Sequence, residues 1–450
     1  MKKLVASVGL VALGASAVQT ASAQSLAAPD NTKPWSVSAA LRGFYDDNIS
    51  TLPNNFTLPP GQHRDSFGFE VNPGVALAWS LETTTISVSY LYSLKYYNNK
   101  PFLSTSHDDQ THTFNAAVTH KFSEQTEGRV SDSFVVGQEP DMLRAGPTMA
   151  TFQRIPGDNI RNYGTIGLDT KLTRLFGIGL GYDNTLYDYA DKGETLPPRG
   201  TPGNILPSFA GTLNRMENGA HIEPTWQLWP ETKGLLGYSF RQIDYTADEF
   251  IGGTVDAGGN IAPPPGSIKS DVRDNRSHRL YVGAEHNFTP DFSGSLRGGF
   301  SYTDYFNDSN TSAKYTPYFN GTLRYLYAPE SYLEGGVSYD RSPADLVGFE
   351  AQSGQFTLDS ATFVIYATLN HRITPWLYGN LMAQYQNSTY NGGLFDGKVD
   401  QDYLVGLNLE YRFTPALSAE VGYNYDNLQS QIPNRHYDRN RVYIGVIARY

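Results

Sequence analysis

Residues 403–425 read YLVGLNLEYRFTPALSAEVGYNY and contain two alternating arms joined by a turn. In the first arm, large apolar side chains occupy every second position from Tyr403 to Phe413, and charged Glu410 and Arg412 lie between them. A period of two indicates a β-strand with one apolar and one polar face. Each arm has about ten residues, enough for a tilted strand to cross a bilayer. The stretch therefore predicts a transmembrane β-hairpin with lipid on one side and water on the other.

The same alternation recurs along the chain. After residue 23 the sequence contains no run of about eighteen apolar residues, so no transmembrane helix is predicted. In lipid every backbone N–H and C=O must be paired, which leaves a closed barrel as the spanning structure. We predict an all-β fold, a single transmembrane antiparallel up-and-down β-barrel of about 18 strands, with 16 as the alternative. The expected strands are 34–46, 65–81, 84–99, 108–122, 126–137, 157–172, 174–190, 211–228, 231–247, 270–288, 291–306, 312–327, 330–343, 354–373, 375–391, 399–413, 416–427 and 438–450.

The expected connections alternate between short turns and long polar loops. Several short ones combine an aromatic or apolar residue with Thr and Pro, as at residues 413–415. Proline presets φ for a turn, and the aromatic side chain suits a membrane interface. In outer-membrane barrels short turns face the periplasm and long loops face outward. Loops 138–156, 191–210 and 248–269 are long enough to fold inward and constrict the lumen, and Pro263–Pro265 would stiffen the last of them.

Three prolines lie inside expected strands that descend from a long loop. Proline removes a hydrogen-bond donor from the ladder, so we interpret these positions as bulges or bends. They are Pro73, Pro224 and Pro317.

The first 23 residues have the features of a Sec signal peptide. Lys2 and Lys3 precede an apolar run that ends at Leu13, and Ala21-Ser22-Ala23 supplies a cleavage site. The run is too short to span a membrane as a helix. Residues 24–450 are therefore expected to form one β-barrel domain without an N-terminal plug.

The composition excludes several classes of function. The formal net charge is −11 and becomes −13 when the two positive charges of Lys2 and Lys3 leave with the signal peptide. An acidic surface argues against nucleic acid as a partner. Cysteine is absent, which rules out a disulfide framework. The 31 tyrosines suit membrane interfaces, where the ring is apolar and the hydroxyl is wet.

The chain stops at Tyr450 after an alternating segment that includes Val442, Ile444 and Val446. This ending resembles the C-terminal assembly signal of outer-membrane barrels, which is usually Phe. The resemblance implies the Gram-negative outer membrane as the location, with its lipid and the barrel-assembly machinery as partners.

Short motifs are similar to the opening of the β-barrel porin family. Residues 44–48 read FYDDN and residues 69–77 read FEVNPGVAL, and Tyr-Asp-Asn returns at 182–184 and 425–427. Members of this family include outer-membrane proteins encoded in exopolysaccharide and capsule clusters. The resemblance implies an outer-membrane barrel and assigns no binding residue, because the substrate of the family is generally unassigned.

A barrel of this size can enclose an aqueous lumen, which favours a porin or channel for hydrophilic solutes or oligosaccharides. The alternatives are an outer-membrane component of exopolysaccharide or capsule secretion or surface assembly, and an outer-membrane enzyme. Inward arginines would favour anionic or sugar-acid solutes. An inward arginine that pairs with an acid would only brace the wall. Glu410 or Glu420 could form such a pair with Arg412 or Arg441. The lumen-facing candidates are Lys95, Arg241, Glu285, Arg297, Arg324, Glu410, Arg412, Glu420 and Arg441.

No catalytic, cofactor or metal site is predicted, and the protein is not expected to be an enzyme. His107 and His112 could suggest a metal site, but they fit the start of a solvated loop better. Ser277 and His278 lie near rim acids, Asp271 and Asp274, without the order of a catalytic triad. Acidic residues at the rim offer Ca²⁺ ligands, but Asp also caps strands and starts turns. These acids are Asp46, Asp47, Asp183 and Asp426.

Overall fold

The computed structural model describes residues 33–100, 106–138, 157–263, 266–308, 313–350 and 353–450. The predicted signal peptide, nearly all of loop 138–156, and Pro264 and Pro265 lie outside these ranges.

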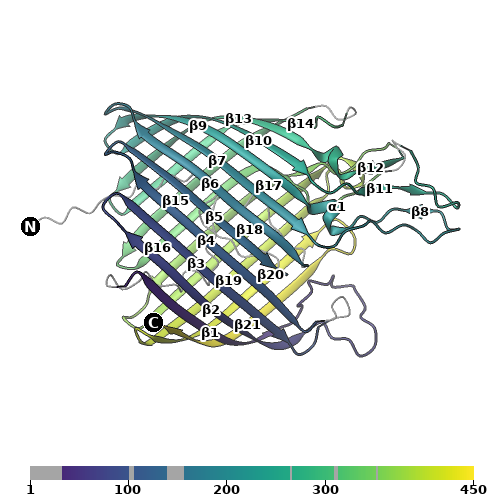
Figure 1. Ribbon diagram of the computed structural model, residues 1–450, viewed down its shortest axis with the longest axis horizontal. Helices are drawn as coiled ribbons and strands as arrows, with labels where there is room; N and C mark the ends of the chain where they lie inside the picture. The colour runs from purple at the N-terminus through teal and green to yellow at the C-terminus, as the bar shows by residue number, and fades with distance from the viewer. Residues whose placement is uncertain (1–32, 101–105, 139–156, 264–265, 309–312, 351–352) are drawn as a thin grey trace, which may run out of the picture.

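An 18-stranded antiparallel sheet closes into a barrel (Figure 1). Its strands pair in chain order, and the first, β1, pairs with the last, β21, from Ser38 opposite Arg449 to Asp46 opposite Arg441. The predicted fold and the higher of the two strand numbers are therefore confirmed. The strands are β1 (Trp35–Asp46), β2 (Ser66–Ser80), β3 (Thr84–Tyr97), β4 (Asp108–Lys121), β5 (Thr126–Gly137), β6 (Asn159–Lys171), β7 (Phe176–Tyr189), β9 (Arg215–Trp229), β10 (Thr232–Tyr245), β13 (Asn275–Thr289), β14 (Phe292–Asp304), β15 (Lys314–Ala328), β16 (Ser331–Pro343), β17 (Asp359–Arg372), β18 (Leu377–Asn391), β19 (Val399–Thr414), β20 (Leu417–Ser430) and β21 (Tyr437–Arg449).

Each strand turns alternate residues to opposite sides of the wall. On β1, Val37 and Leu41 are 45% and 53% exposed, whereas Arg42 and Asp46 are 9% and 0% exposed. The apolar set faces outward to lipid, and the polar set packs inside the barrel.

Short turns and long connections lie at opposite ends of the barrel (Figure 1). The C-terminus lies at the short-turn end, which faces the periplasm in outer-membrane barrels. Tyr450 exchanges two backbone hydrogen bonds with Val37, at 2.8 and 2.9 Å, and its ring lies 5.5 Å from that of Trp35. The last residue thus completes the seam between β21 and β1.

The long-loop end carries small elements that the alternation does not predict. Among them, β8 (Gly203–Asn204), β11 (Phe250–Val255) and β12 (Ser267–Lys269) form a three-stranded sheet. Figure 1 shows this sheet beyond the ends of the barrel strands. The expectation that loops 191–210 and 248–269 fold inward is therefore wrong, because the two loops pair with each other.

Three strands begin later than predicted because the preceding residues adopt other structure. The α-helix α1 (Phe209–Leu213) precedes β9, and the 3₁₀-helix η2 (Ser270–Arg273) precedes β13. Before β17, Phe356 and Leu358 pack into a cluster with Tyr305. A further 3₁₀-helix, η3 (Gly393–Phe395), lies in the loop before β19. No helix in the described ranges is both long and apolar enough to cross a membrane.

The three strand prolines do not form bulges, which corrects that part of the prediction, whereas the predicted bends stay a prediction. The β2–β3 register is the same on both sides of Pro73, with Val71 opposite Leu94 and Gly74 opposite Leu91. The β9–β10 register is likewise unchanged across Pro224. Each proline stays in register with the preceding strand, and its pairing with the following strand is missing: Pro73 lies opposite Ala39, Pro224 opposite Ile178 and Pro317 opposite Phe300.

Candidate channel lumen

Five inward residues, which we call the charged cluster, form a buried group where β9, β10, β13 and β14 lie side by side. Arg297 donates to Glu223 at 3.2 Å and to Glu285 at 3.0 Å. Lys233 lies 2.7 Å from Glu285, and the Tyr281 hydroxyl donates to Glu223 at 3.1 Å. Glu223 and Arg297 are only 3% and 4% exposed. Two acids and two cations thus neutralise each other inside the wall.

A second group spans the seam where the barrel closes. Arg42 on β1 donates to Glu420 on β20 at 2.6 Å and to Glu70 on β2 at 3.3 Å. Arg441 donates to Glu70 at 3.1 Å, and Lys95 lies opposite Glu70 in the β2–β3 register. These side chains link strands from both ends of the chain.

The other predicted lumen residues also have partners of opposite charge. Arg241 lies 3.9 Å from Asp183 and 3.7 Å from Glu217. Arg324 lies 3.4 Å from Glu334. The charge of each arginine is therefore offset locally.

Glu410 accepts from Arg412 at 3.3 Å and from Arg449 at 2.8 Å. The Arg412–Glu410 pair is one that the bracing hypothesis anticipated, whereas Glu420 and Arg441 pair with residues that it did not name. The Arg412 guanidinium also lies 3.8 Å from the ring centre of Tyr378.

A cavity of about 600 Å³ lies near the short-turn end of the barrel. Arg42, Tyr378, Asn408, Glu410 and Glu420 are among its lining residues. Asn408 donates to Glu420 at 3.0 Å, which fixes the amide at the cavity wall. The cavity offers both donors and acceptors to a polar solute.

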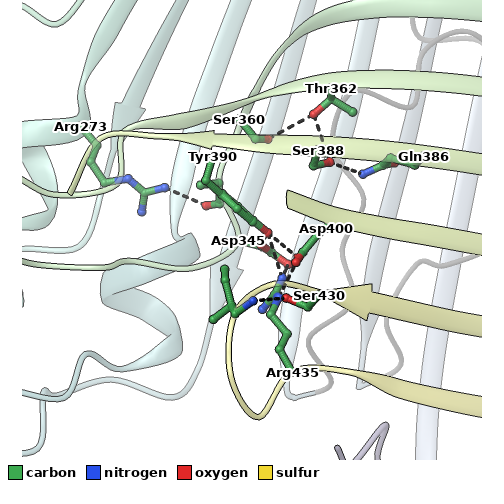
Figure 2. A network of polar contacts seen from close by, with 12 residues as sticks. Arg273, Asp345, Ser360, Thr362, Gln386, Ser388, Tyr390, Asp400, Ser430 and Arg435 are labelled. Atoms are coloured by element: carbon green, nitrogen blue, oxygen red, sulfur yellow. Dashed lines mark hydrogen bonds and ion pairs between the residues drawn. The ribbon is translucent and has the colours of Figure 1, made fainter. Parts of the chain in front are cut away.

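Four uncharged polar residues on β17 and β18 form what we call the neutral wall: Tyr366, Thr368, Gln384 and Gln386. Gln386 donates to Ser388 at 3.0 Å, as Figure 2 shows. Within the described residues, both amide atoms of Gln384, Gln386 Oε1, Thr368 Oγ1 and the Tyr366 hydroxyl have no hydrogen-bond partner. All four side chains are at most 9% exposed, so these are buried donors and acceptors that the protein itself leaves unused.

At the long-loop end, Arg435 joins a loop to two strands (Figure 2). It donates to Asp400 at 2.8 Å, to Asp345 at 2.6 Å and to the Tyr390 hydroxyl at 3.2 Å. Burial acts to lower the pKa of Arg435, but Asp345, Tyr390 and Asp400 together raise it above the ordinary value. The arginine therefore stays charged and holds the loop before β21 against the loop before β17.

Arg273 of η2 joins three loops in the same region. It is 0% exposed and donates to the carbonyl oxygens of Thr212 at 2.9 Å and Ala344 at 2.7 Å. Its guanidinium lies 4.3 Å from the ring centre of Tyr245. Figure 2 shows Arg273 reaching across from its own loop toward the polar network.

The neighbouring Asp274 has a raised pKa of about 6. Burial is the main cause, and the nearby acids Asp244 and Asp271 add to it. Its carboxylate accepts from the Tyr245 backbone at 2.7 Å and from Asn307 at 3.0 Å.

The groups considered for metal or catalytic chemistry are not brought together. Within the described residues, no cluster of three or more His, Asp or Glu could hold a metal ion. The His278 ring nitrogen bonds to the Tyr238 hydroxyl at 2.8 Å, on the outer face. The rim acids have partners of their own: Asp46 pairs with Arg439, Asp47 with Asn440, Asp183 with Arg241 and Asp426 with Tyr437.

Several residues of the inner wall are not among the predicted lumen residues, although the alternation points to them. Arg42 follows outward Leu41, Glu70 follows outward Phe69, and Glu223 follows outward Ile222. The period of two therefore assigns all three to the inner face.

The C-terminal part of the chain matches a known family. Residues 359–450, which hold β17 to β21, match the sequence model of the family described as "Putative beta-barrel porin 2". Over these residues the chain is similar to a β-barrel porin family. The predicted resemblance to β-barrel porins is thus confirmed, and a search of curated proteins finds no match.

A comparison with solved structures finds outer-membrane proteins at low sequence identity. OpdK of Pseudomonas aeruginosa, solved with vanillate, is 12% identical, with 92% of this chain and 99% of OpdK covered and a TM-score of 0.45. OccAB4 of Acinetobacter baumannii is 11% identical, with 94% and 100% covered and a TM-score of 0.42. The ferric enterobactin receptor PfeA of Pseudomonas aeruginosa is 10% identical, with 92% and 80% covered and a TM-score of 0.41.

Proposed function

We propose that this barrel is a channel for hydrophilic solutes in the outer membrane. The observation that carries the proposal is a closed barrel whose inner wall is polar while its outer wall is apolar. Such a wall keeps the inside wet and the outside in lipid. We also propose that the protein is not an enzyme and that the barrel-assembly machinery recognises the strand that ends at Tyr450.

The ion pairs support a solute that is polar rather than strongly charged. Arg297 and Arg42 each contact two carboxylates, so little net field from these arginines reaches a passing ion. The sequence expectation of anion or sugar-acid preference therefore has less support than bracing of the wall.

The neutral wall supports a solute rich in hydroxyl groups, which includes oligosaccharides. Amides and hydroxyls both donate and accept, as sugar hydroxyls do, and Gln384 has both of its amide atoms unused by the described residues. This observation also favours the second candidate, a component of exopolysaccharide or capsule export, because that role passes longer chains of the same chemistry.

The test is to reconstitute the refolded protein in planar bilayers and in liposomes. We expect single-channel current with weak anion/cation preference and swelling of liposomes in neutral oligosaccharides. Protein that resists heat-induced unfolding on a gel but carries no current and admits no sugar would overturn the channel proposal. Passage of long chains with little passage of monosaccharide would favour export.

A further inference from the structure

A row of polar side chains crosses the outer face of the barrel, where lipid is expected. It consists of Asp132 on β5, Asn162 on β6, Asn184 on β7 and Asn218 on β9, and we call it the outer polar row. In the strand registers Asp132 lies opposite Gly164, Gly164 opposite Asn184, and Asn184 opposite Asn218. The row therefore crosses four neighbouring strands, and on β6 its member Asn162 lies two residues along the strand from the register position of Gly164.

Asp132 lies within the apolar outer surface and not at its edge. Its neighbours on the same face of β5 are Val130, which is 50% exposed, and Phe134. Phe134 and Phe114 form an aromatic pair with ring centres 6.4 Å apart, on the loop side of Asp132. Asp132 thus lies deeper toward the membrane than these rings, in a strand of only twelve residues.

The row satisfies only part of its own hydrogen-bonding capacity. Asn162 donates to Asp132 Oδ1 at 3.0 Å, and Asn184 donates to Asn218 Oδ1 at 2.9 Å. Within the described ranges, no hydrogen bond engages Asp132 Oδ2, Asn162 Oδ1 or Asn218 Nδ2, and no cation forms an ion pair with Asp132. Hydrocarbon cannot supply the missing partners, and ionisable groups on a lipid face are destabilising.

The opposite part of the outer wall has no such feature at this depth. On β18 and β19 the outward residues Leu381 and Leu407 lie opposite each other and are 39% and 41% exposed, and Leu407 lies opposite Tyr423 on β20. The row continues in register from Asn218 to Gln242 on β10 and Arg276 on β13, near the loop ends of those strands, and the compared positions of β18 and β19 are apolar.

We propose that the outer polar row is the surface through which two copies of this chain associate in the membrane. A primary amide both donates and accepts, so asparagines that face the same asparagines across a two-fold axis complete each other's hydrogen bonds. Asp132 gains amide donors from the second copy. Small outward residues beside the row, Ala116, Gly164 and Ala220, allow the two walls to approach closely.

The absence of cysteine from the chain permits a clean cross-linking test. Asn184→Cys and the matched control Leu381→Cys are compared in native outer membranes after mild oxidation. We expect a disulfide-linked dimer for Asn184→Cys at several times the yield of Leu381→Cys. Equal yields, or a cross-link from Asn184→Cys to a protein of another mass, would overturn the proposal.

Native mass spectrometry of protein extracted in mild detergent provides the second readout. The wild-type chain is expected to be mainly dimeric, and the double variant Asp132→Leu, Asn184→Leu mainly monomeric with unchanged single-channel current. The control Asn387→Leu, an outward asparagine on β18, is expected to stay dimeric. A monomeric wild-type chain, or a double variant that remains dimeric and heat-resistant on gels, contradicts the proposal.

Discussion

The charged cluster on β9, β10, β13 and β14 and the neutral wall on β17 and β18 line the same lumen from different strands. In the charged cluster, Arg297, Glu223 and Glu285 hold one another within 3.2 Å. In the neutral wall, Gln384 has no partner for either amide atom within the described residues. The comparison suggests a division of labour, in which ions brace the wall, whereas the buried uncharged groups have no partner of their own and become available to a solute only when their side chains turn into the lumen.

The largest expected effect follows from breaking the charged cluster. Glu223→Ala leaves Arg297 buried with one carboxylate fewer and Tyr281 without its acceptor, so we expect a loss of about 3 kcal/mol in the free energy of unfolding. Urea unfolding in detergent micelles measures this loss. The double variant Glu223→Leu, Arg297→Met is the control and is expected to recover most of the stability, because it removes both charges. A stable single variant would mean that this pair does not brace the wall.

Removing the hydrogen bonds of Arg435 at the long-loop end of the barrel is expected to have an intermediate effect on stability. Arg435→Gln removes charge-assisted bonds to Asp345 and Asp400, so the loop before β17 should open more readily by about 2 kcal/mol. Faster amide hydrogen exchange in residues 344–350 is the readout. Exchange in β17 itself serves as the internal control and should not change. Unchanged exchange in the loop would show that other contacts hold it.

The neutral wall provides the converse test. Gln384→Leu removes polar atoms that have no partner in the described protein, so unfolding stability should change by less than about 1 kcal/mol. Uptake of neutral oligosaccharide should fall about fivefold, which corresponds to ~1 kcal/mol of lost interaction. Liposome swelling measures uptake, and Glu285→Gln serves as the charged-cluster control. A loss of stability without a loss of uptake would reverse the division between the two regions.

The smallest effect concerns Asp274, whose pKa is raised to about 6. A raised carboxyl pKa adds stability that is fully present below the ordinary value near 3.8 and is lost as the pH rises through about 6. We expect the mouth loops to be more stable at pH 4 than at pH 7 by about 1 kcal/mol, since solvent screens this site. Hydrogen exchange around residues 270–275 at the two pH values tests this. Asp274→Asn should remove the difference.

The alternation predicted the eighteen strands because each strand has one face in contact with lipid. Every second residue lies on that face and is mostly apolar. The alternation could not predict which charged side chains form ion pairs. Arg42 and Glu420 are 378 positions apart and touch only because β1 closes against β21. The contacts of Arg297 depend on the stagger between strands, which a single sequence does not specify. The sheet of β8, β11 and β12 was missed because its strands are too short to show a period.

The three strand prolines have a consequence for the way the barrel grows. Pro73, Pro224 and Pro317 each remain in register with the preceding strand and lack pairing with the following one. In a partly folded barrel whose following strand has not yet paired, each proline lies on the open edge of the unfinished sheet. An edge that lacks a donor is a poor template for a strand from another chain. We therefore expect replacement of these prolines to increase aggregation during refolding while leaving the finished barrel intact.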